Sequence, residues 1–448
     1  MLYKLVKPDL SRIGPDEMSR ALNQENISEV FDFMKKSARQ EYLYWDTIRF
    51  KEPSPKSLSK ETLWQIIKMF RQGQSLKTPM RDTNGNFFSW SKLDYFEAFF
   101  HELDMNTGGE IFVEKSGVDK ANKQKLITRG IMEEAIASSQ LEGAATSRQA
   151  AKKLLREGRK PSNRSEQMIV NSYLSMKALE ERYRDSEMSM DLILELHSLI
   201  TKDTVDSQGE APRMRKSGEP VCVTDDASGI IYHEGPDIAF VQKELVRLIE
   251  FANDEDESEG ETFVHPIVKA IMLHFWMGYL HPFTDGNGRL ARLLFYWYLI
   301  KKGYWAFVYL PISKVIKKSP KQYIMAYVYS EQDDNDMTYF LDYNIRKIKI
   351  AVRDFSEYLE KQSGKNSQMK RRCDVKYKLN IRQVQLLQYL HGDSDERTTL
   401  MAHMNVNQIA KMTASKDLKD LVEKGFLSLS KQGRNVYYHG TEKIKELF

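Results

Sequence analysis

The sequence predicts a mainly helical protein with a small α/β unit in its C-terminal part, and three observations support this fold class. The chain has 448 residues, of which 41% are hydrophobic and 11% aromatic, values that suit two or three globular domains. Apolar side chains recur at helical spacing over 123–142, 165–183, 189–201, 237–253, 263–279, 288–301 and, in pieces, 320–360. Beyond residue 376, helical spacing is followed by short alternating runs that read as strands.

We expect residues 1–115 to form a mostly helical N-terminal region. Its clearest helix is Ser59–Gln72, which places Leu63, Ile66, Ile67 and Phe70 on one face. Many tyrosines, tryptophans and phenylalanines indicate that the region has a core of its own. No chemical motif occurs in it, so we assign it to packing or to docking of a target.

The C-terminal part divides into a predicted linker at 361–375 and a predicted winged helix-turn-helix domain at 376–448. Its helices are expected from Ile381, over 406–412 and over 415–424, followed by strands at 426–429 and 435–439. This order resembles a winged helix, in which the third helix and the wing can contact DNA phosphates. The basic residues at those positions are Lys416, Lys419, Lys431 and Arg434. A winged helix also often mediates protein contacts or dimerisation, so both interpretations stay open.

Composition limits the class of protein. Only Cys222 and Cys373 are cysteines, which excludes a disulfide framework and a cysteine zinc site and fits a cytoplasmic location. The first residues lack the apolar core of a signal peptide, and no run approaches about 18 apolar residues, so we expect no membrane span. The net charge is +4, with 15 Lys and Arg against 9 Asp and Glu from Lys370 onward. This basic C-terminal part favours DNA only weakly, since most charged runs are solvated surface.

The richest chemical pattern is the segment 281–292, which reads HPFTDGNGRLAR. A glycine turn frees backbone N–H groups to face phosphate oxygens. A helix predicted to begin directly after it would add the positive end of its dipole. Arg289 and Arg292 lie three residues apart on one face of that helix, and a guanidinium can grip two phosphate oxygens. The segment therefore suits the handling of a nucleoside triphosphate.

Each side chain of this segment has an expected role. His281 can accept a proton from an attacking hydroxyl, because free imidazole titrates near about 6.5. Asp285 is a hard oxygen ligand that suits Mg²⁺. The remaining groups are expected to hold phosphates; they are Gly286, Asn287, Gly288, Arg289 and Arg292.

Position for position, the segment resembles the signature of the Fic family, HPFx(D/E)GNGRxxR. The resemblance implies an all-helical Fic core over 116–360 that carries a β-hairpin flap. It further implies transfer of AMP from ATP to a Ser, Thr or Tyr hydroxyl of a target protein, with Mg²⁺ present. In that reading His281 is the base, Asn287 is part of the catalytic group, Asp285 binds the metal, and Asn287, Arg289 and Arg292 bind phosphates. Fic proteins also frequently form homodimers.

A second motif lies upstream, at the end of the predicted helix 123–142. Ser138 and Glu142 lie four residues apart and face the same way, and Gly143 ends the helix. A carboxylate at the negative end of a helix is unfavourable and needs a cation nearby. The segment resembles the inhibitory Fic motif (S/T)xxxE(G/N), and this resemblance names Arg292 as the cation. A Glu142–Arg292 pair would occupy the arginine needed for the γ-phosphate, so the enzyme would inhibit itself.

Two further predictions depend on the same resemblance. A β-rich run before Asp225 and another after Ser228 predict a hairpin. As the Fic flap, its residues Val221, Cys222, Val223 and Thr224 would pair with the backbone of a target. The alternative is an ordinary surface hairpin. Tyr323 falls where relatives place nucleobase contacts, and it suits a buried core aromatic equally well.

The leading hypothesis is a self-inhibited, Mg²⁺-dependent protein adenylyltransferase. A first alternative is removal of AMP from a modified protein, alone or together with transfer, in which Glu142 positions water. A second alternative is a DNA-binding regulator whose Fic domain senses a nucleotide. ATP itself follows from the resemblance, because the motif determines phosphate handling better than the base.

Overall fold

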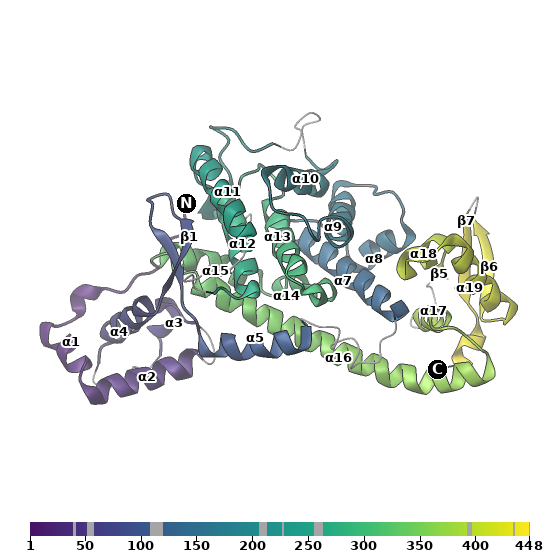
Figure 1. Cartoon of the computed structure of the whole chain (residues 1–448), viewed down its shortest axis with the longest axis horizontal. Helices are drawn as coiled ribbons and strands as arrows, with labels where there is room; N and C mark the ends of the chain where they lie inside the picture. Colours follow the sequence, from purple (N-terminus) through teal and green to yellow (C-terminus); the bar gives the residue numbers. More distant parts are fainter. Residues whose placement is uncertain are drawn as a thin grey trace.

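The computed structural model describes residues 1–38, 42–51, 58–107, 120–205, 213–225, 228–254, 263–391, 397–432 and 435–447. The chain is mainly helical, as predicted. Figure 1 shows the N-terminal helices at one end, a central helical bundle, and a C-terminal unit at the other end. The long helix α16 (Thr338–Lys376) extends from the bundle towards the C-terminal unit.

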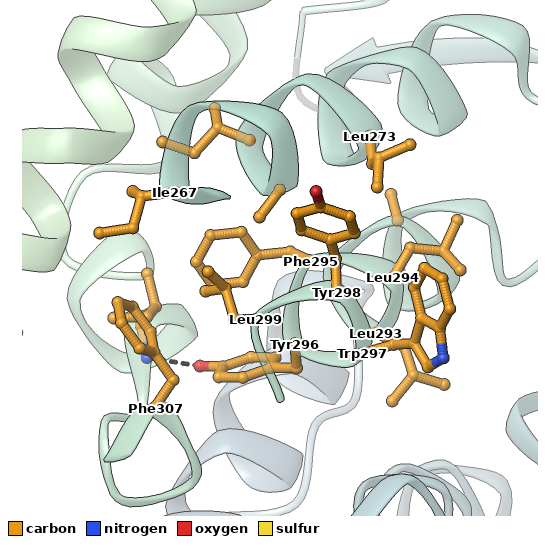
Figure 2. Close-up of a cluster of buried hydrophobic side chains, with 14 of the residues drawn as sticks. Ile267, Leu273, Leu293, Leu294, Phe295, Tyr296, Trp297, Tyr298, Leu299 and Phe307 are labelled. Atoms are coloured by element: carbon orange, nitrogen blue, oxygen red, sulfur yellow. Dashed lines mark hydrogen bonds between the residues drawn. The ribbon is translucent and has the colours of Figure 1, made fainter. Parts of the chain in front are cut away.

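The central bundle consists largely of the expected helices. These are α7 (Lys120–Leu141), α9 (Arg164–Glu181), α10 (Met190–Thr201), α11 (Ile238–Asn253), α12 (Pro266–Leu280), α13 (Asn287–Lys301) and α15 (Pro320–Gln332). Every residue of α12 after Pro266 is buried, and so is nearly all of α13. Figure 2 shows the aromatic and aliphatic side chains that fill the space around them. A helix that is apolar on all sides must be covered on all sides, so the loop between α12 and α13 has a rigid base.

Three short elements of the bundle were not predicted: α8 (Arg148–Glu157), η2 (Trp305–Tyr309) and α14 (Ile312–Ile316). Local signals for α8 exist, since Ser147 accepts a hydrogen bond from the N–H of Ala150 and Gly158 ends the helix at φ 62°. Two ion pairs tie α8 to α7. Glu133 accepts from Arg148 Nε at 2.8 Å and from Lys152 Nζ at 2.6 Å.

The predicted hairpin is present as β3 (Cys222–Asp225) and β4 (Ile230–Glu234), an antiparallel pair with a bulge between Val223 and Thr224. Residues 226 and 227 of its turn lie outside the described residues. The outer edge of β4 is paired with the first residues of the chain. The N–H of Tyr3 donates to the carbonyl of Ile231 at 2.7 Å, and the N–H of Ile231 donates to the carbonyl of Met1 at 3.0 Å. The edge of β3 is therefore the one left for a further strand.

The N-terminal region is mostly helical, as expected. It contains η1 (Leu10–Arg12), α1 (Pro15–Ala21), α2 (Gln24–Ala38), α3 (Trp45–Ile48), α4 (Lys60–Gly73), β1 (Leu76–Arg81), β2 (Phe87–Trp90) and α5 (Asp94–Thr107). The predicted helix at Ser59–Gln72 is α4, with Ser59 as its N-cap. The core of this region continues into the bundle through Tyr232 of the flap and Met325 of α15.

The C-terminal unit contains α17 (Ile381–His391), β5 (Arg397–Thr398), α18 (Leu400–Asn407), α19 (Lys411–Glu423), β6 (Leu427–Gln432), β7 (Asn435–Gly440) and η3 (Glu442–Glu446). Its sheet has the order β5-β7-β6, and the elements follow one another as a winged helix requires. The helix expected over 406–412 was wrong. Thr399 caps α18, Gln408 ends it at φ 50°, and α19 begins at Lys411.

The predicted linker at 361–375 is helical and continues α16 without a break. Its lysines, arginines, glutamines and methionine are good helix formers, and a single Gly364 costs only about 1 kcal/mol. The glycine was therefore a weak signal for an irregular linker. None of the helices in the described ranges, α16 included, is long and apolar enough to cross a bilayer.

Candidate active site

His281 lies directly after α12, in the left-handed conformation at φ 44°. Its Nδ1 donates to the carbonyl of Gly278 in the last turn of α12. Because a carbonyl only accepts, Nδ1 carries the proton of the neutral ring, and the lone pair lies on Nε2. Burial, followed by repulsion from His233, lowers the pKa of His281 to about 3. The ring is therefore neutral at pH 7, and the residue as a whole is partly buried.

The loop at 281–287, called here the motif loop, is closed by its own side chains. Asn287 accepts from the N–H of Phe283 at 3.0 Å and donates to its carbonyl at 2.7 Å. Phe283 is buried, and its ring stacks on His197 with centroids 3.6 Å apart. His197 Nε2 lies 2.9 Å from the carbonyl of Asp285. The Asn287 amide, expected to hold phosphate, here determines the shape of the loop.

Asp285, the predicted metal ligand, lies at the start of α13. Its Oδ1 accepts from the N–H of Gly286 at 2.5 Å and from Arg289 Nη2 at 3.1 Å. Its Oδ2 accepts from Arg164 Nη2 at 3.3 Å, and the side chain is 32% exposed. No group of three His, Cys, Asp or Glu suited to a metal occurs within the described ranges. One carboxylate nevertheless fits Mg²⁺, which often takes one or two carboxylates together with substrate phosphates.

The two arginines of the motif are buried and differ in their partners. Arg289 Nη1 donates to the carbonyl of Ile200 at 2.9 Å. Arg292 Nε donates to Ser138 Oγ at 2.9 Å, and its Nη2 donates to the Ser138 carbonyl at 3.0 Å. The same Nη2 lies 3.0 Å from Glu142 Oε1. The predicted ion pair between Glu142 and Arg292 is thus present, and Ser138 of the same motif supports it.

Glu142 follows the last residue of α7, where Gly143 turns the chain at φ 91°. Its carboxylate lies over Gly288 in the first turn of α13. A Cβ built on Gly288 would lie 2.2 Å from Glu142 Oε1, so only glycine leaves room for this carboxylate. The N-terminal end of a helix favours anions, through its free N–H groups and its dipole. The carboxylate of Glu142 therefore occupies an anion site.

The segment before the flap and the residue that follows β4 contact the motif loop. The N–H of Arg215 donates to the carbonyl of Pro282 at 2.9 Å, and its Nε donates to the carbonyl of His281 at 2.8 Å. At Gly235, a Cβ would lie 3.3 Å from that of His281. The predicted flap residues Cys222, Val223 and Thr224 form β3, and Val221 precedes it. The end of the flap is thus held against His281.

Tyr323 packs in the core, with its hydroxyl 2.7 Å from His274 Nε2. Burial raises the pKa of Tyr323, and the neighbouring Arg292 acts in the opposite direction. The partly buried ring therefore packs against the core near Arg292, and its contact with a nucleobase stays a prediction.

Sequence reasoning missed three residues at the motif loop, Arg164, His197 and His233, and it missed Glu331, which binds His233. They come from α9, α10, β4 and α15. No local pattern marks them, because they reach the loop through the packing of distant elements.

The basic residues predicted to contact DNA belong to the C-terminal unit. Lys416 and Lys419 are exposed on α19, and Lys431 is exposed on β6. Arg434 lies outside the described residues. Asp420 and Glu423 lie on α19 together with the two lysines, so the surface of this helix carries both signs of charge.

Comparison with known proteins finds similar sequences and structures. The protein adenylyltransferase fic-1 of Caenorhabditis elegans is 31% identical over 118 residues, which are 26% of this chain and 20% of that protein. The protein adenylyltransferase Fic of Nematostella vectensis is 40% identical over 62 residues, 14% of each chain. The matched segments span a fifth or less of these relatives. A crystal structure of a Fic family protein from Desulfovibrio desulfuricans G20 has a TM-score of 0.49 and 18% identity, covering 79% of this chain and 97% of that one.

A sequence profile of the Fic/DOC family matches residues 187–299. This range includes the flap, α12, the motif loop and α13, which together surround His281. It ends before the C-terminal unit and begins after α7. Through residues 187–299, the chain carries a domain of the Fic/DOC family.

Proposed function

We propose that this chain is a Mg²⁺-dependent protein adenylyltransferase, which moves AMP from ATP onto a Ser, Thr or Tyr hydroxyl of a target and is inhibited by its own Glu142. The observation that carries the proposal is the place of the Glu142 carboxylate, over Gly288 and 3.0 Å from Arg292. An anion site at the start of a helix, lined by a buried arginine, suits a phosphate equally well. The names of the relatives that match part of this chain support the same activity.

In this proposal the triphosphate and Glu142 compete for one site. Arg289 and Arg292 are 2% and 3% exposed, so their charges act in surroundings of low polarity. While Glu142 binds Arg292, the terminal phosphate lacks its arginine and ATP adopts an unreactive pose. Release of Glu142 frees Arg292 for the γ-phosphate and brings the α-phosphate into line with the attacking hydroxyl.

The chemistry uses the lone pair on His281 Nε2. This nitrogen takes the proton of the target hydroxyl while the hydroxyl oxygen forms a bond to the α-phosphorus. The bond from that phosphorus to its bridging oxygen breaks, and pyrophosphate leaves. Because the pKa of His281 is lowered to about 3, the ring is unprotonated at neutral pH and its Nε2 lone pair is free. Asp285 would hold Mg²⁺, which neutralises phosphate charge when bound.

The flap offers one edge to a target. Residues Met1–Tyr3 already pair with β4, so a target strand would add along β3. Cys222 and Thr224 on β3 are exposed, and the end of the flap lies next to His281. A hydroxyl on the added strand would then be presented to His281 Nε2.

Transfer from ATP labelled on the α-phosphate tests the proposal. Label should enter protein, increase with Glu142→Gly, and disappear when His281→Ala is added to that variant. ATP labelled on the γ-phosphate is the control and should leave protein unlabelled, because pyrophosphate departs with that label. Labelling that persists in the His281→Ala variant, or unchanged transfer in Glu142→Gly, would contradict the proposal. Competition by GTP and CTP in the same assay identifies the preferred base.

The reverse reaction is tested with an AMP-modified target. Release of AMP by the unaltered protein, lost in Glu142→Gly, would favour removal of AMP with Glu142 as a participant. DNA binding through Lys416 and Lys419, with homodimer formation, is a separate proposal for the C-terminal unit, supported by the exposure of both lysines.

A further inference from the structure

His233, on β4 of the flap, belongs to neither sequence motif and is 7% exposed. Its Nδ1 lies 2.8 Å from Glu331 Oε2 of α15, and its Nε2 lies 2.8 Å from the carbonyl of Tyr279 in α12. A carboxylate and a carbonyl only accept hydrogen bonds, and a neutral imidazole has a single N–H. Both bonds form together only when both ring nitrogens are protonated. The geometry therefore requires an imidazolium.

The groups around this ring favour its positive charge. Tyr279 lies in the last turn of α12, where unpaired carbonyls carry partial negative charge. Burial lowers the pKa of His233, but Glu331, the Tyr279 carbonyl and Glu234 raise it, and the net pKa lies above the ordinary value. The neighbouring ring of His281 is uncharged.

His233 also lies beside the proposed base. The centroids of the His233 and His281 rings are 5.6 Å apart. The two histidines bind adjacent carbonyls at the end of α12, His281 that of Gly278 and His233 that of Tyr279. A second cation near His281 is Arg215, which binds its backbone carbonyl. A fixed positive charge on His233 at this distance makes a charge on His281 unfavourable.

We propose that His233 is a positioning residue, which as an imidazolium holds the flap at the end of α12 and extends to lower pH the range in which His281 stays unprotonated. It acts through His281 and does not touch the substrate. The effect of His233 on AMP transfer rests on the proposed function, whereas the positive charge of its ring does not. At 5.6 Å and an effective dielectric constant of about 20, loss of this charge should raise the pKa of His281 by roughly two pH units.

The first test measures the protonation of His233 in the full chain by NMR of ¹⁵N-labelled histidine at pH 7.5, with His233→Gln to assign its signals. Both nitrogens of His233 should be protonated. His197 is the internal control: its Nδ1 has no hydrogen-bond partner within the described residues and its pKa is lowered, so it should show one protonated nitrogen. A neutral His233 at this pH would overturn the proposal without any bearing on AMP transfer.

The second test compares His233→Gln with His233→Lys, which restores a cation, in the Glu142→Gly variant. The acid side of the pH profile of AMP transfer should move up by about two pH units with Gln and by less with Lys. The His281 signals should begin to titrate near pH 5 in the Gln variant and not in its parent. If both variants lower the rate equally at every pH, and the His281 signals do not move, then His233 only holds the flap against α12 and the proposal is wrong.

Discussion

Two ion pairs, one between the end of α7 and α13 and one in the C-terminal unit, are built in opposite ways. Between Glu142 and Arg292 the arginine is buried, with 4% of its side chain exposed, and the carboxylate is 29% exposed. Between Arg382 and Asp417 the carboxylate is buried, with 5% exposed, and the arginine is 24% exposed. The member that can leave is the acid in the first pair and the base in the second.

On the proposed function, the first pair can open to regulate AMP transfer, whereas the second pair stabilises the fold. When Glu142 leaves, Arg292 keeps both bonds to Ser138, and an incoming phosphate can replace the carboxylate. Asp417 cannot leave its site in the same way, because Asn380, Arg382 and His403 all bind its carboxylate at 2.7–3.3 Å. Removal of one partner from a buried pair is strongly destabilising. We therefore expect the first pair to control activity and the second to control stability.

The largest effect is expected at the buried arginine of the first pair. In the Glu142→Gly variant, Arg292→Lys should lower the rate of AMP transfer by about 10²- to 10³-fold, because an ammonium cannot replace the guanidinium fork on phosphate. Initial rates with α-labelled ATP measure this. Arg247→Lys on α11, an arginine paired with Glu244 on its own helix, is the control and should keep the rate. An Arg292→Lys variant as fast as its parent would mean that the arginine does not hold phosphate.

The next largest effect is on stability. Asp417→Asn should lower the free energy of unfolding of the C-terminal unit by about 3 kcal/mol, with AMP transfer unchanged. Hydrogen exchange of residues 397–432, followed by mass spectrometry, measures the local opening. Glu442→Gln in η3 is the control, because this carboxylate is 87% exposed, pairs with Lys445 and should contribute less than about 1 kcal/mol. Equal effects of the two substitutions would remove the contrast between the ion pairs.

The Glu142→Gln variant distinguishes the effect of the charge of the Glu142 carboxylate from the effect of its size. The amide keeps the volume over Gly288 but loses the ion pair, so AMP transfer should rise by about tenfold, less than with Glu142→Gly. The same labelling assay measures it. A rate unchanged from the unaltered protein would mean that Glu142 inhibits by its bulk and not by its charge.

The parts of the site that sequence analysis predicted have local signals. The motif loop depends on a glycine turn, the Glu142 segment on spacing and a helix-ending Gly143, and the flap on two short β-rich runs. His233 and Arg164 gave no such signal, since their contacts come from elements far apart in the chain. Helix α8 has a cap and an apolar face but only ten residues, so its pattern was too short to stand out. The boundary errors in the C-terminal unit arose where Thr399 and Gln408, rather than glycine or proline, begin and end a helix.

The lowered pKa of His281 also predicts how the fold responds to acid. The native ring titrates near 3, whereas an unfolded histidine titrates near about 6.5, so the unfolded chain binds more protons between these values. The free energy of unfolding should therefore fall as pH decreases below about 6.5, by at most about 1.4 kcal/mol per pH unit from this group. Urea unfolding at pH 7, 6 and 5 measures the slope. His281→Asn, a residue that tolerates the left-handed conformation, should show a shallower slope; an identical slope would contradict a depressed pKa.

The smallest effect concerns the surface of the C-terminal unit. The buried pair of Arg382 and Asp417 stabilises this unit. Contact with nucleic acid must therefore come from exposed charges such as Lys416 and Lys419. If α19 binds duplex DNA, changing both to Gln should weaken binding at low salt and reduce the slope of log K against log salt by about 2. Lys424→Gln is the matched control, because this lysine is held by Asp420 at 2.7 Å. Fluorescence anisotropy of a labelled duplex measures the binding. Absence of binding by the unaltered protein at low salt would contradict the DNA interpretation and leave protein contact as the alternative for this unit. AMP transfer should be the same in all three proteins.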